Sequence, residues 1–300
     1  MRKYLFVINP NAGKKAGRHL MQLITTQLPR QLAHELIVWE NKNDFSDIEK
    51  LIKQGEHSHV IAVGGDGTVN KVAACVVGTK KILGIVPAGS GNGLARSMGI
   101  SMDPAKAIFE MAVAKTIQID AAEVNGQFFF CTSGVGFDAR IGHLFANSKR
   151  RGLLSYIGIT TKELFRYRAT EYELEIDKQR IKRKAFLVTV ANAGQYGNDF
   201  YIAPLAKLSD GQLIVAIFKP FSALAVPGIL RKFLRKEAHM SKYIESHRSN
   251  EITIYRSQPD SIHFDGEPKH EDKVLHYKVH PSALNIIVGK NYKKETVLDF

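Results

Sequence analysis

One short stretch, from Val60 to Asn70, constrains the fold of this chain more than any other. It reads Val-Ile-Ala-Val-Gly-Gly-Asp-Gly-Thr-Val-Asn, so four apolar residues are followed at once by three glycines around one aspartate. Four consecutive apolar residues bounded by glycines predict a short buried strand, and the residues from Thr68 to Val77 predict a helix. Glycines at such a junction let the backbone turn sharply and let a ligand approach bare backbone N–H groups.

The predicted turn sits at the N-terminus of a helix. That end carries partial positive charge and unpaired backbone donors, which suits a phosphate group. Asp66 lies on the same turn and repels phosphate unless a cation lies between them. The combination indicates a nucleotide phosphate held with Mg²⁺. A glycine-rich turn that binds nothing is an equally good interpretation of this stretch alone.

Strands and helices alternate through the first half of the chain. We expect strands at Tyr4–Ile8, Leu36–Trp39, His59–Val63 and Ile82–Val86, with helices at Lys14–Leu28, Asp44–Gln54, Thr68–Val77, from Leu94 and from Asp103-Pro104. This order is typical of a Rossmann-like α/β fold, a parallel sheet covered on both faces. Ligands of such sheets bind beyond the carboxyl ends of the strands. The loops at 9–14, 64–70 and 87–93 all follow strands, which favours a nucleotide site at that edge.

The second half changes character and predicts a β-rich sandwich or barrel. We expect strands at Gln118–Asn125, Gln127–Thr132, Tyr172–Ile176, Ala185–Asn192, Gln212–Phe218, Glu251–Tyr255 and Val274–Val279. Two helical stretches interrupt them, at 136–168, where a break at Gly152 or Gly158 is left open, and at 222–237. The predicted domains are therefore 1–118, an α/β domain, and 119–284, a β sandwich. The tail at 285–300 is expected to return to the first domain.

The charge balance favours an anionic partner. The chain has 300 residues, with 42 Lys and Arg against 29 Asp and Glu, and a formal net charge of +13. Such a charge suits nucleic acid, an acidic membrane surface or a phosphorylated ligand. Each basic run, such as 178–184, is by default a solvated face. No aromatic and basic platform or known module indicates nucleic acid, so we expect no nucleic-acid partner.

The cysteines and apolar runs indicate a cytoplasmic protein. Cys75 and Cys131 lie in apolar surroundings without metal-ligand spacing, which predicts buried thiols in a reducing compartment. No run approaches the roughly 20 apolar residues of a membrane-spanning helix. The N-terminus enters a strand after Lys3, so we expect no signal peptide.

Several acids elsewhere are candidates for chemistry. Asp265 and Glu267 flank one glycine after a strand, although Asp-Gly is the commonest hairpin pair and an ordinary turn is the default. Asp210 is also followed by glycine, and an ordinary turn is the default interpretation there too. Asp120 ends an apolar strand and is a candidate buried acid at the domain junction. There is no HExxH pair, no Walker lysine loop and no protein-kinase motif set.

Taken together, these motifs resemble the diacylglycerol-kinase-type lipid kinases, a family that includes the sphingosine kinases. The turn at 64–68 alone is shared with NAD kinases, whereas the ordered set is highly specific. The matching segments span nearly the whole chain: Asn9-Pro10-Asn11-Ala12-Gly13-Lys14, Gly64-Gly65-Asp66-Gly67-Thr68-Val69-Asn70, Pro87-Ala88-Gly89-Ser90-Gly91-Asn92, Asp120, Gly134-Val135-Gly136-Phe137-Asp138-Ala139, Asp210-Gly211 and Asp265-Gly266-Glu267.

The resemblance implies ATP binding between two domains and phosphoryl transfer to a lipid hydroxyl, with the β sandwich as the lipid-binding domain. The residues that would contact the nucleotide are Asn9, Pro10, Asn11, Gly13, Lys14, Gly64, Gly65, Gly67, Thr68, Asn70, Gly89, Ser90, Gly91 and Asn92. Asp66 would act through Mg²⁺. Asp265 matches the general base assigned in bacterial diacylglycerol kinases. In sphingosine kinases that role is assigned to the aspartate matching Asp66, so the two residues compete for it.

Further acids carry implied roles. Glu267 and Asp120 would belong to a network that links the base to the metal. Asp210 matches a structural Mg²⁺ site, which the backbone carbonyls of Lys207 and Gln212 would complete.

The chain departs from the family pattern at three places, and these put the lipid in doubt more than the reaction. Gly93 stands where bacterial diacylglycerol kinases commonly have Asp, and is closer to the sphingosine and ceramide kinases. Ser209 stands where an acid is frequent. Glu40-Asn41 replaces a threonine expected after the second strand.

The first hypothesis is thus an ATP-dependent lipid kinase acting on diacylglycerol, a monoacylglycerol or a sphingoid base, bound peripherally at the inner membrane surface. Membrane access would come from apolar residues at 153–165 beside Lys149-Arg150-Arg151, or at 224–234 beside its basic residues, although most of these apolar positions are expected to be core. The alternatives are a NAD kinase, which shares the turn at 64–68, and a non-enzymatic nucleotide- or lipid-binding protein. A homodimer is left open.

Overall fold

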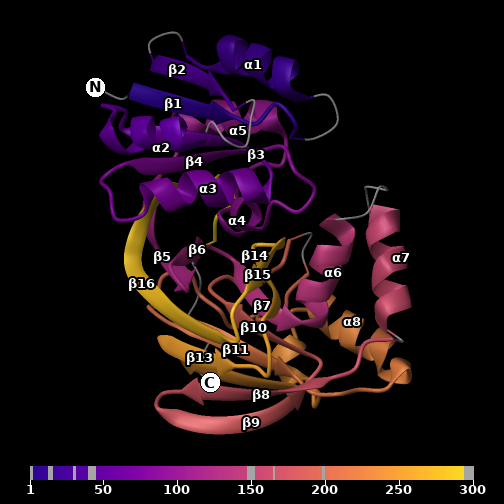
Figure 1. Ribbon diagram of the computed structural model, residues 1–300. Helices are drawn as coiled ribbons and strands as arrows, with labels where there is room; N and C mark the ends of the chain where they lie inside the picture. Colours follow the sequence, from indigo (N-terminus) through magenta and orange to yellow (C-terminus); the bar gives the residue numbers. More distant parts are fainter. Residues whose placement is uncertain are drawn as a thin grey trace. The chain divides into compact units, whose positions relative to one another are not determined.

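The computed structural model describes residues 3–12, 16–29, 32–39, 45–146, 153–164, 166–197 and 200–293 (Figure 1). The chain divides into two compact units, one formed by Met1–Ala121 with Pro281–Phe300 and the other by Ala122–His280. The chain passes between them along β5 (Thr116–Val124) and β16 (Val274–Ile287). The predicted fold class, an α/β domain with a β-sandwich domain, is confirmed.

The first unit is built on a parallel sheet with the strand order β2-β1-β3-β4. Its strands are β1 (Lys3–Ile8), β2 (Ala33–Val38), β3 (His59–Gly64) and β4 (Ile82–Pro87). All of β3 is buried, as expected for a strand with helices on both faces. The register pairs Ile8 with Val63 and Gly64 with Pro87. The loops that follow β1, β3 and β4 therefore begin side by side at one edge.

Helices cover this sheet. They are α1 (Ala16–Gln27), α2 (Phe45–Gln54), α3 (Asp66–Val76), α4 (Gly93–Ser97) and α5 (Pro104–Met111). Apolar residues of α1 and α5 pack on one face, against alternate strand residues such as Phe6 and Ile61. α3 packs against β3 and α2 (Figure 1). α5 begins as the sequence predicts, because the Asp103 carboxylate accepts the Ala105 N–H at 3.0 Å and Pro104 occupies the first turn.

The segment after Pro281 adds a strand to this sheet. The end of β16 lies parallel to β4, with Asn285 opposite Ile82 and Ile286 opposite Leu83. Beyond it, the Val288 N–H donates to the Lys115 carbonyl at 2.9 Å. The edge of β4 is thus covered by chain that comes about 200 residues later in the sequence.

The second unit is a β sandwich. One sheet has the order β12-β11-β10-β7-β14-β15, and the other layer contains β13, β8, β9 and the first part of β16. Buried residues from both layers form one core between them. The strands are β6 (Gln127–Phe129), β7 (Thr132–Gly136), β8 (Thr170–Ile176), β9 (Gln179–Ala185), β10 (Leu187–Ala191), β11 (Leu213–Phe218), β12 (Ile244–Ser249), β13 (Glu251–Tyr255), β14 (Asp260–Phe264) and β15 (Glu267–Glu271).

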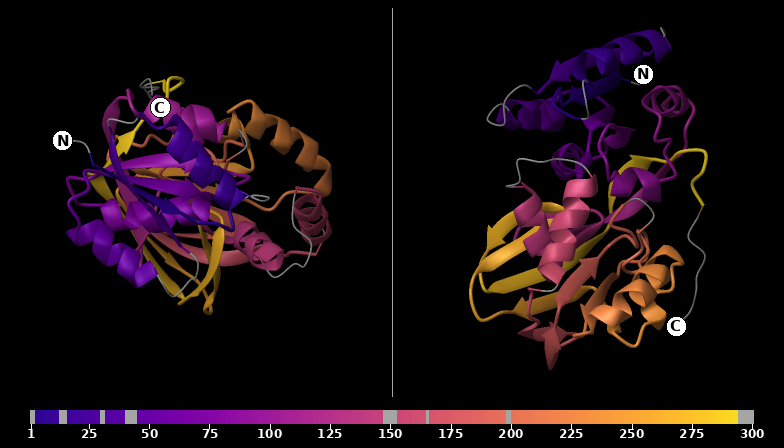
Figure 2. Two further views of the ribbon diagram at one scale, coloured as in Figure 1. Left: turned by 90° about the horizontal axis from the view of Figure 1, so that it is seen from above. Right: turned by 90° about the vertical axis from the view of Figure 1, so that its right-hand side faces the viewer.

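Three helices cover the outer face of the six-stranded sheet (Figures 1 and 2). They are α6 (Phe137–Ala146), α7 (Leu153–Leu164) and α8 (Val226–Leu234), and they share an apolar layer with β10, β11 and β12. The stretch at 136–168 thus contains two helices, and residues 147–152 between them lie outside the described residues. Gly158 does not break α7. α8 is shorter than the predicted 222–237 and is flanked by the short 3₁₀ turns η2 (Ala223–Ala225) and η3 (Ala238–Met240).

Four strands, β7, β9, β12 and β15, were not among those expected from the sequence. β9 coincides with the basic run at 178–184 and is the last strand of its layer. Such charged edge strands discourage pairing with another chain. Its charges are matched across the strands, since Arg180 pairs with Glu173 and Glu175, and Lys182 with Glu173. The run is a solvated face, which was its default interpretation.

A charge cluster joins β9, β11 and β12 around Glu245. The Arg183 guanidinium donates to both carboxylate oxygens at 3.0 and 3.1 Å, and Lys219 and His247 lie at 3.2 and 2.9 Å. The hydrogen bond from Arg183 lowers the pKa of Glu245 to about 2. A carboxyl group whose pKa is lower in the folded state stabilises the protein above its unfolded pKa.

We predict that Glu245→Gln lowers the free energy of unfolding by about 1 to 2 kcal/mol at neutral pH. The difference from the unchanged protein should shrink as the pH falls from about 4.5 towards 2, because the carboxylate of the unchanged protein then becomes protonated. Urea denaturation at a series of pH values measures this. Glu171→Gln, an exposed acid on β8, is the control. A difference that does not vary with pH would contradict the prediction.

Candidate functional site

The loop after β1 is tied to the loop after β3 through Asn9. The Asn9 side-chain amide donates to the Thr68 hydroxyl at 3.0 Å, and the Asn9 backbone N–H donates to the Val63 carbonyl at 3.1 Å. The other side-chain atom, Oδ1, accepts the Asn11 N–H at 3.0 Å, which closes the turn around Pro10. The next two predicted nucleotide contacts, Gly13 and Lys14, lie outside the described residues.

The loop after β3 is a tight junction of strand and helix, as predicted. α3 starts at Asp66, two residues before the predicted start, and the Gly65 carbonyl accepts the N–H groups of Thr68 and Val69. Thr68 is buried against Gly64, where a Cβ atom would stand 2.5 Å from the Thr68 hydroxyl. Gly67 and Asn70 lie on the first turns of the same helix.

Asp66 binds the loop after β4. Its Oδ2 accepts the Asn92 N–H at 2.8 Å and its Oδ1 accepts the Gly93 N–H at 2.7 Å. A Cβ atom at residue 91 would stand 2.7 Å from Asp66 Oδ2, so this close approach needs Gly91. Both carboxylate oxygens of Asp66 thus fix the backbone of a second glycine turn.

The loop after β4 is closed by Asn92, which adopts a left-handed conformation with φ of 53°. Its side chain accepts the Gly89 N–H at 3.1 Å and donates to the Gly89 carbonyl at 2.9 Å. Gly89 in turn lies so close to Gly65 that a Cβ atom at 89 would stand 2.6 Å from the Gly65 Cα atom. Ser90 is exposed at the tip. The structure therefore brings together the three loops that the sequence placed at one edge.

This arrangement can hold an anion. The N-terminus of α3 carries partial positive charge, and Gly65, Gly67 and Gly91 have no side chain to cover their backbone N–H groups. A turn built in this way favours phosphate oxygens over bulkier groups.

We predict that Gly89→Ala lowers the free energy of unfolding by about 1 to 3 kcal/mol, because the added Cβ forces the turns at 65 and 89 apart. Gly228→Ala in α8 is the matched control, since a Cβ at 228 meets nothing within 4 Å. The control should be neutral or slightly stabilising. Urea denaturation of both variants measures the difference, and equal stabilities would contradict the close approach.

In the second unit, Asp265 is the first central residue of the hairpin turn between β14 and β15. Asp265 and Gly266 both have positive φ, 49° and 89°, as a two-residue type I′ turn requires. The Asp265 carboxylate accepts three backbone N–H groups: Oδ2 from Phe130 at 3.0 Å, and Oδ1 from Cys131 at 2.7 Å and Thr132 at 3.1 Å. The residue is thus both the expected hairpin turn and a carboxylate held in a fixed position.

Glu267 is exposed at the start of β15, opposite Phe264. The other end of this hairpin is stabilised by Arg256. The Arg256 guanidinium donates to the backbone carbonyls of Asp260, Ser261, Glu271 and Asp272. The network of Glu267 with the base and the metal stays a prediction.

A buried polar cluster beside the hairpin was only partly predicted from the sequence. The motif at 134–139 includes Asp138, but the partners of this residue were not predicted. Its Oδ2 accepts the Tyr196 hydroxyl at 2.8 Å, the His263 Nε2–H at 3.0 Å and the Thr189 hydroxyl at 3.2 Å. Gly134 leaves the room for it, since a Cβ there would stand 2.8 Å from Asp138 Oδ2. The cluster joins α6, which carries Asp138, to β10, to β14 and to the loop that carries Tyr196.

The acids predicted to bind metal belong to different units of the chain. Asp120, in the first unit, is buried and accepts the Ser282 N–H at 2.8 Å. Asp210, in the second unit, accepts the Gln212 N–H at 3.1 Å and lies 3.8 Å from the Arg248 guanidinium. The structural Mg²⁺ site at Asp210 with Lys207 and Gln212 stays a prediction. Within the described ranges, no group of three or more His, Cys, Asp or Glu side chains is arranged to hold a metal ion.

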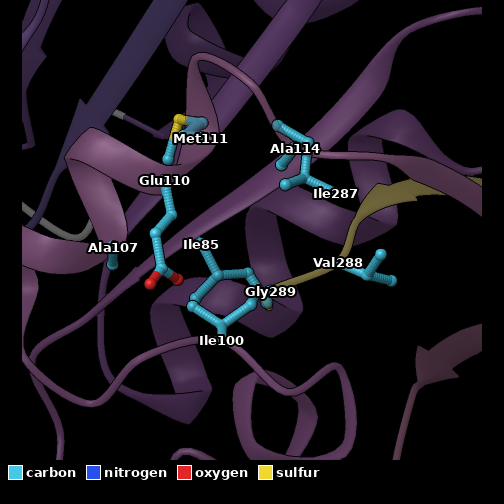
Figure 3. A pocket seen from close by; sticks show the side chains of 9 residues that line it. All are labelled: Ile85, Ile100, Ala107, Glu110, Met111, Ala114, Ile287, Val288 and Gly289. Atoms are coloured by element: carbon cyan, nitrogen blue, oxygen red, sulfur yellow. The ribbon is translucent and has the colours of Figure 1, made fainter. Parts of the chain in front are cut away.

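A small apolar hollow in the first unit, about 10 Å³ in volume, has room for about one water molecule and does not suit a nucleotide (Figure 3). It lies among α5, β4 and the end of β16, and its lining includes Ile85, Met111 and Ile287. Glu110 supplies its one carboxylate, which repels phosphate.

Both cysteines are buried and free, as predicted. Burial raises the pKa of the Cys75 thiol to about 12. At neutral pH this residue is therefore a protonated, unreactive thiol.

We predict that iodoacetamide modifies Cys75 in the folded protein at about pH 8 roughly 100-fold or more slowly than in the unfolded chain, because only the thiolate reacts. Peptide mass spectrometry measures the modification, and the same reaction in guanidinium chloride is the control. Equal rates in both states would contradict a buried thiol.

Comparison with known proteins identifies the family. The profile of the diacylglycerol kinase catalytic domain matches residues 3–124, and that of the YegS C-terminal NAD kinase beta sandwich-like domain matches residues 132–288. The chain belongs to the diacylglycerol kinase and YegS-like family of lipid kinases. The predicted family and the prediction of a kinase are thereby confirmed, and a kinase uses ATP.

Relatives of the kinase match over nearly its whole length. It is 26% identical over 275 residues to the diacylglycerol kinase of Bacillus subtilis strain 168, covering 89% of this chain and 90% of that protein. It is 27% identical over 292 residues to a probable lipid kinase YegS-like of Enterobacter sp. strain 638, covering 94% of each. A crystal structure of a diacylglycerol kinase from Bacillus anthracis strain Sterne matches with a TM-score of 0.74 at 18% identity, covering 96% of this chain and 97% of that one, and shares the fold.

Proposed function

We propose that the kinase transfers the γ-phosphate of Mg-ATP to a lipid hydroxyl, with diacylglycerol as the first candidate and a monoacyl lipid or a sphingoid base as the next. Its place of action would be the cytoplasmic surface of the inner membrane. The observation that carries the proposal is the pair of hydrogen bonds that the Asp66 carboxylate accepts from the N–H groups of Asn92 and Gly93. These bonds hold two glycine turns together at a helix N-terminus. The names of the relatives support the choice of lipid.

The nucleotide would be held by the three joined loops of the first unit. Backbone amides of Gly65, Gly67, Ser90 and Gly91 would bind phosphate oxygens, and the Asn9–Thr68 bond would keep the first loop in place. Mg²⁺ commonly binds through one or two carboxylates together with substrate phosphates, so Asp66 would serve as a protein ligand. The cation would neutralise phosphate charge.

Asp265 is the better candidate for the general base. Its carboxylate is fixed by three backbone N–H groups at a half-buried hairpin turn, where a lipid hydroxyl can approach from solvent. Asp66 instead lies within the glycine turns, where its charge faces the phosphates and their cation. In the reaction, the lipid hydroxyl would give its proton to Asp265 as its oxygen forms a bond to the γ-phosphorus and the bond to ADP breaks.

The first experiment measures transfer of labelled γ-phosphate from Mg-ATP to micellar diacylglycerol, monoacylglycerol, sphingosine, ceramide and undecaprenol, with NAD as an outgroup. One labelled lipid would identify both the reaction and the substrate. Label only in NADP would replace the proposal by a NAD kinase, the alternative that the shared turn at 64–68 favours. No label with ATP still bound would indicate a binding protein or an untested lipid.

We predict that Asp265→Asn lowers lipid phosphorylation roughly 100-fold or more, because loss of a general base removes the proton acceptor. Nucleotide binding should change little, since the nucleotide loops belong to the other unit. Trp39, the single tryptophan, is placed to report on binding, because its backbone N–H donates to the Ile8 carbonyl beside Asn9. Its fluorescence is titrated with Mg-ATP.

Asp260→Asn is the matched control on the same hairpin, and it should keep full activity. Asp66→Asn should weaken nucleotide binding as well as turnover, because it loosens the turn at 89–93. Full activity of Asp265→Asn would exclude Asp265 as the base and leave the role to Asp66.

A further inference from the structure

An exposed apolar patch surrounds α8 in the second unit. Six large apolar side chains are exposed in the described part of the chain, and four of them lie between residues 224 and 240. They are Leu224, Leu230, Leu234 and Met240, which are 92, 44, 63 and 65% exposed. Isolated exposed leucines are ordinary, but a group of four in one short segment indicates a binding surface.

Along α8, two buried apolar residues lie one helical turn apart, and so do two exposed leucines. Ile229 and Phe233 are buried and pack into the helix layer, where Phe233 lies against Phe200 and Phe218. The next residues, Leu230 and Leu234, form an exposed apolar stripe beside them. The core of the unit therefore uses one stripe of the helix, and a second apolar stripe is left to the surface.

A basic stripe lies next to the apolar one. Arg231 and Arg235 follow the two leucines and are exposed, and Lys236 and Lys242 are exposed nearby. Between residues 222 and 243 the sequence has five Lys or Arg and one acid, Glu237. Lys232 is turned back onto the segment itself, since its amine donates to the Met240 carbonyl.

We propose that this surface docks the kinase on an anionic phospholipid bilayer. The α8 face is defined as Leu224, Leu230, Leu234 and Met240 with Arg231, Arg235, Lys236 and Lys242. An interfacial helix buries an apolar stripe among the acyl chains while its cations bind the headgroups, and the α8 face offers both. No helix among the described residues is long and apolar enough to span a membrane. The inference rests on the proposed function in one respect, that the bilayer carries the lipid substrate.

Charge favours a bilayer over a second copy of the chain. A symmetric dimer would place the same surface of both copies together, so the four cations of each α8 face would meet like charges. The formal net charge of +13 adds to that repulsion. A nucleic acid would satisfy the cations but would leave the leucine stripe without an apolar partner. An anionic bilayer offers acyl chains to the apolar stripe and anionic headgroups to the basic stripe.

The test is flotation of the purified full chain with vesicles of phosphatidylglycerol and phosphatidylcholine, and with phosphatidylcholine alone. The protein should bind the anionic vesicles at low salt. The double variant Arg231→Gln/Arg235→Gln should lower the partition coefficient roughly 25-fold, since each cation contributes about fivefold. Leu230→Ser/Leu234→Ser should lower it on the order of tenfold or more, and high salt should not abolish this difference.

The matched control is Phe109→Ser/Val113→Ser, which removes the other two exposed large apolar side chains of the described residues, one on α5 and one just after it. It should leave vesicle binding unchanged. Thermal denaturation checks that each variant folds, as expected because Ile229 and Phe233 are kept. Equal binding of the leucine variant and the unchanged protein would overturn the proposal and indicate a purely electrostatic surface, as for nucleic acid. A dimer in analytical ultracentrifugation that the leucine variant dissociates would assign the face to a second copy instead.

Failure of this inference and failure of the proposed function are distinguishable. Lipid phosphorylation in detergent micelles without vesicle binding would overturn the docking face alone. Vesicle binding that depends on the α8 face, without phosphorylation of any lipid, would keep the docking face and overturn the proposed reaction.

Discussion

The bonds from the Asp66 carboxylate to the backbone of residues 92 and 93 hold the candidate nucleotide site together. The parallel strands bring the loops to one edge, but they do not fix how the loops lie against each other. The carboxylate does so, and it needs Gly89 and Gly91 because no Cβ atom fits between the turns. The second unit uses the same device, since Asp265 holds the backbone at 130–132. In both units an acid acts on its surroundings through main-chain amides.

Most of the first unit was predictable because its signals are local. Buried parallel strands read as continuous apolar runs, and capping residues such as Asp103 mark helix starts. The second unit was harder to predict. β9 consists largely of charged residues because it lies at a sheet edge. Its basic residues are recognisable as part of a strand only once they are seen to pair with Glu173 and Glu175 on the neighbouring strand. The boundary between α6 and α7 was left open, since Gly158 is tolerated inside α7 while glycine usually weakens a helix.

The candidate site was predictable in its acids and unpredictable in their partners. The turn at Asp265 and Gly266 has the composition of a hairpin, and it is one. Its second property, a carboxylate that accepts amides about 135 residues away, leaves no trace in local sequence. The same holds for Asp138 on α6, whose bonds to Thr189, Tyr196 and His263 reach β10, a loop and β14. Spacing along the chain reports periodic structure, whereas these contacts depend on how the strands pair.

The return of the chain to β4 has a consequence for synthesis on the ribosome. Residues 122–280 are continuous and can fold as soon as they have emerged. The first unit is made earlier but lacks its neighbour for β4 until the end of β16 is made, and the Asn285 side chain bonds to the Thr79 carbonyl 206 positions back. During that interval the edge of β4 is open and able to pair with another strand. The part of the protein that is synthesised first is therefore the part that is completed last.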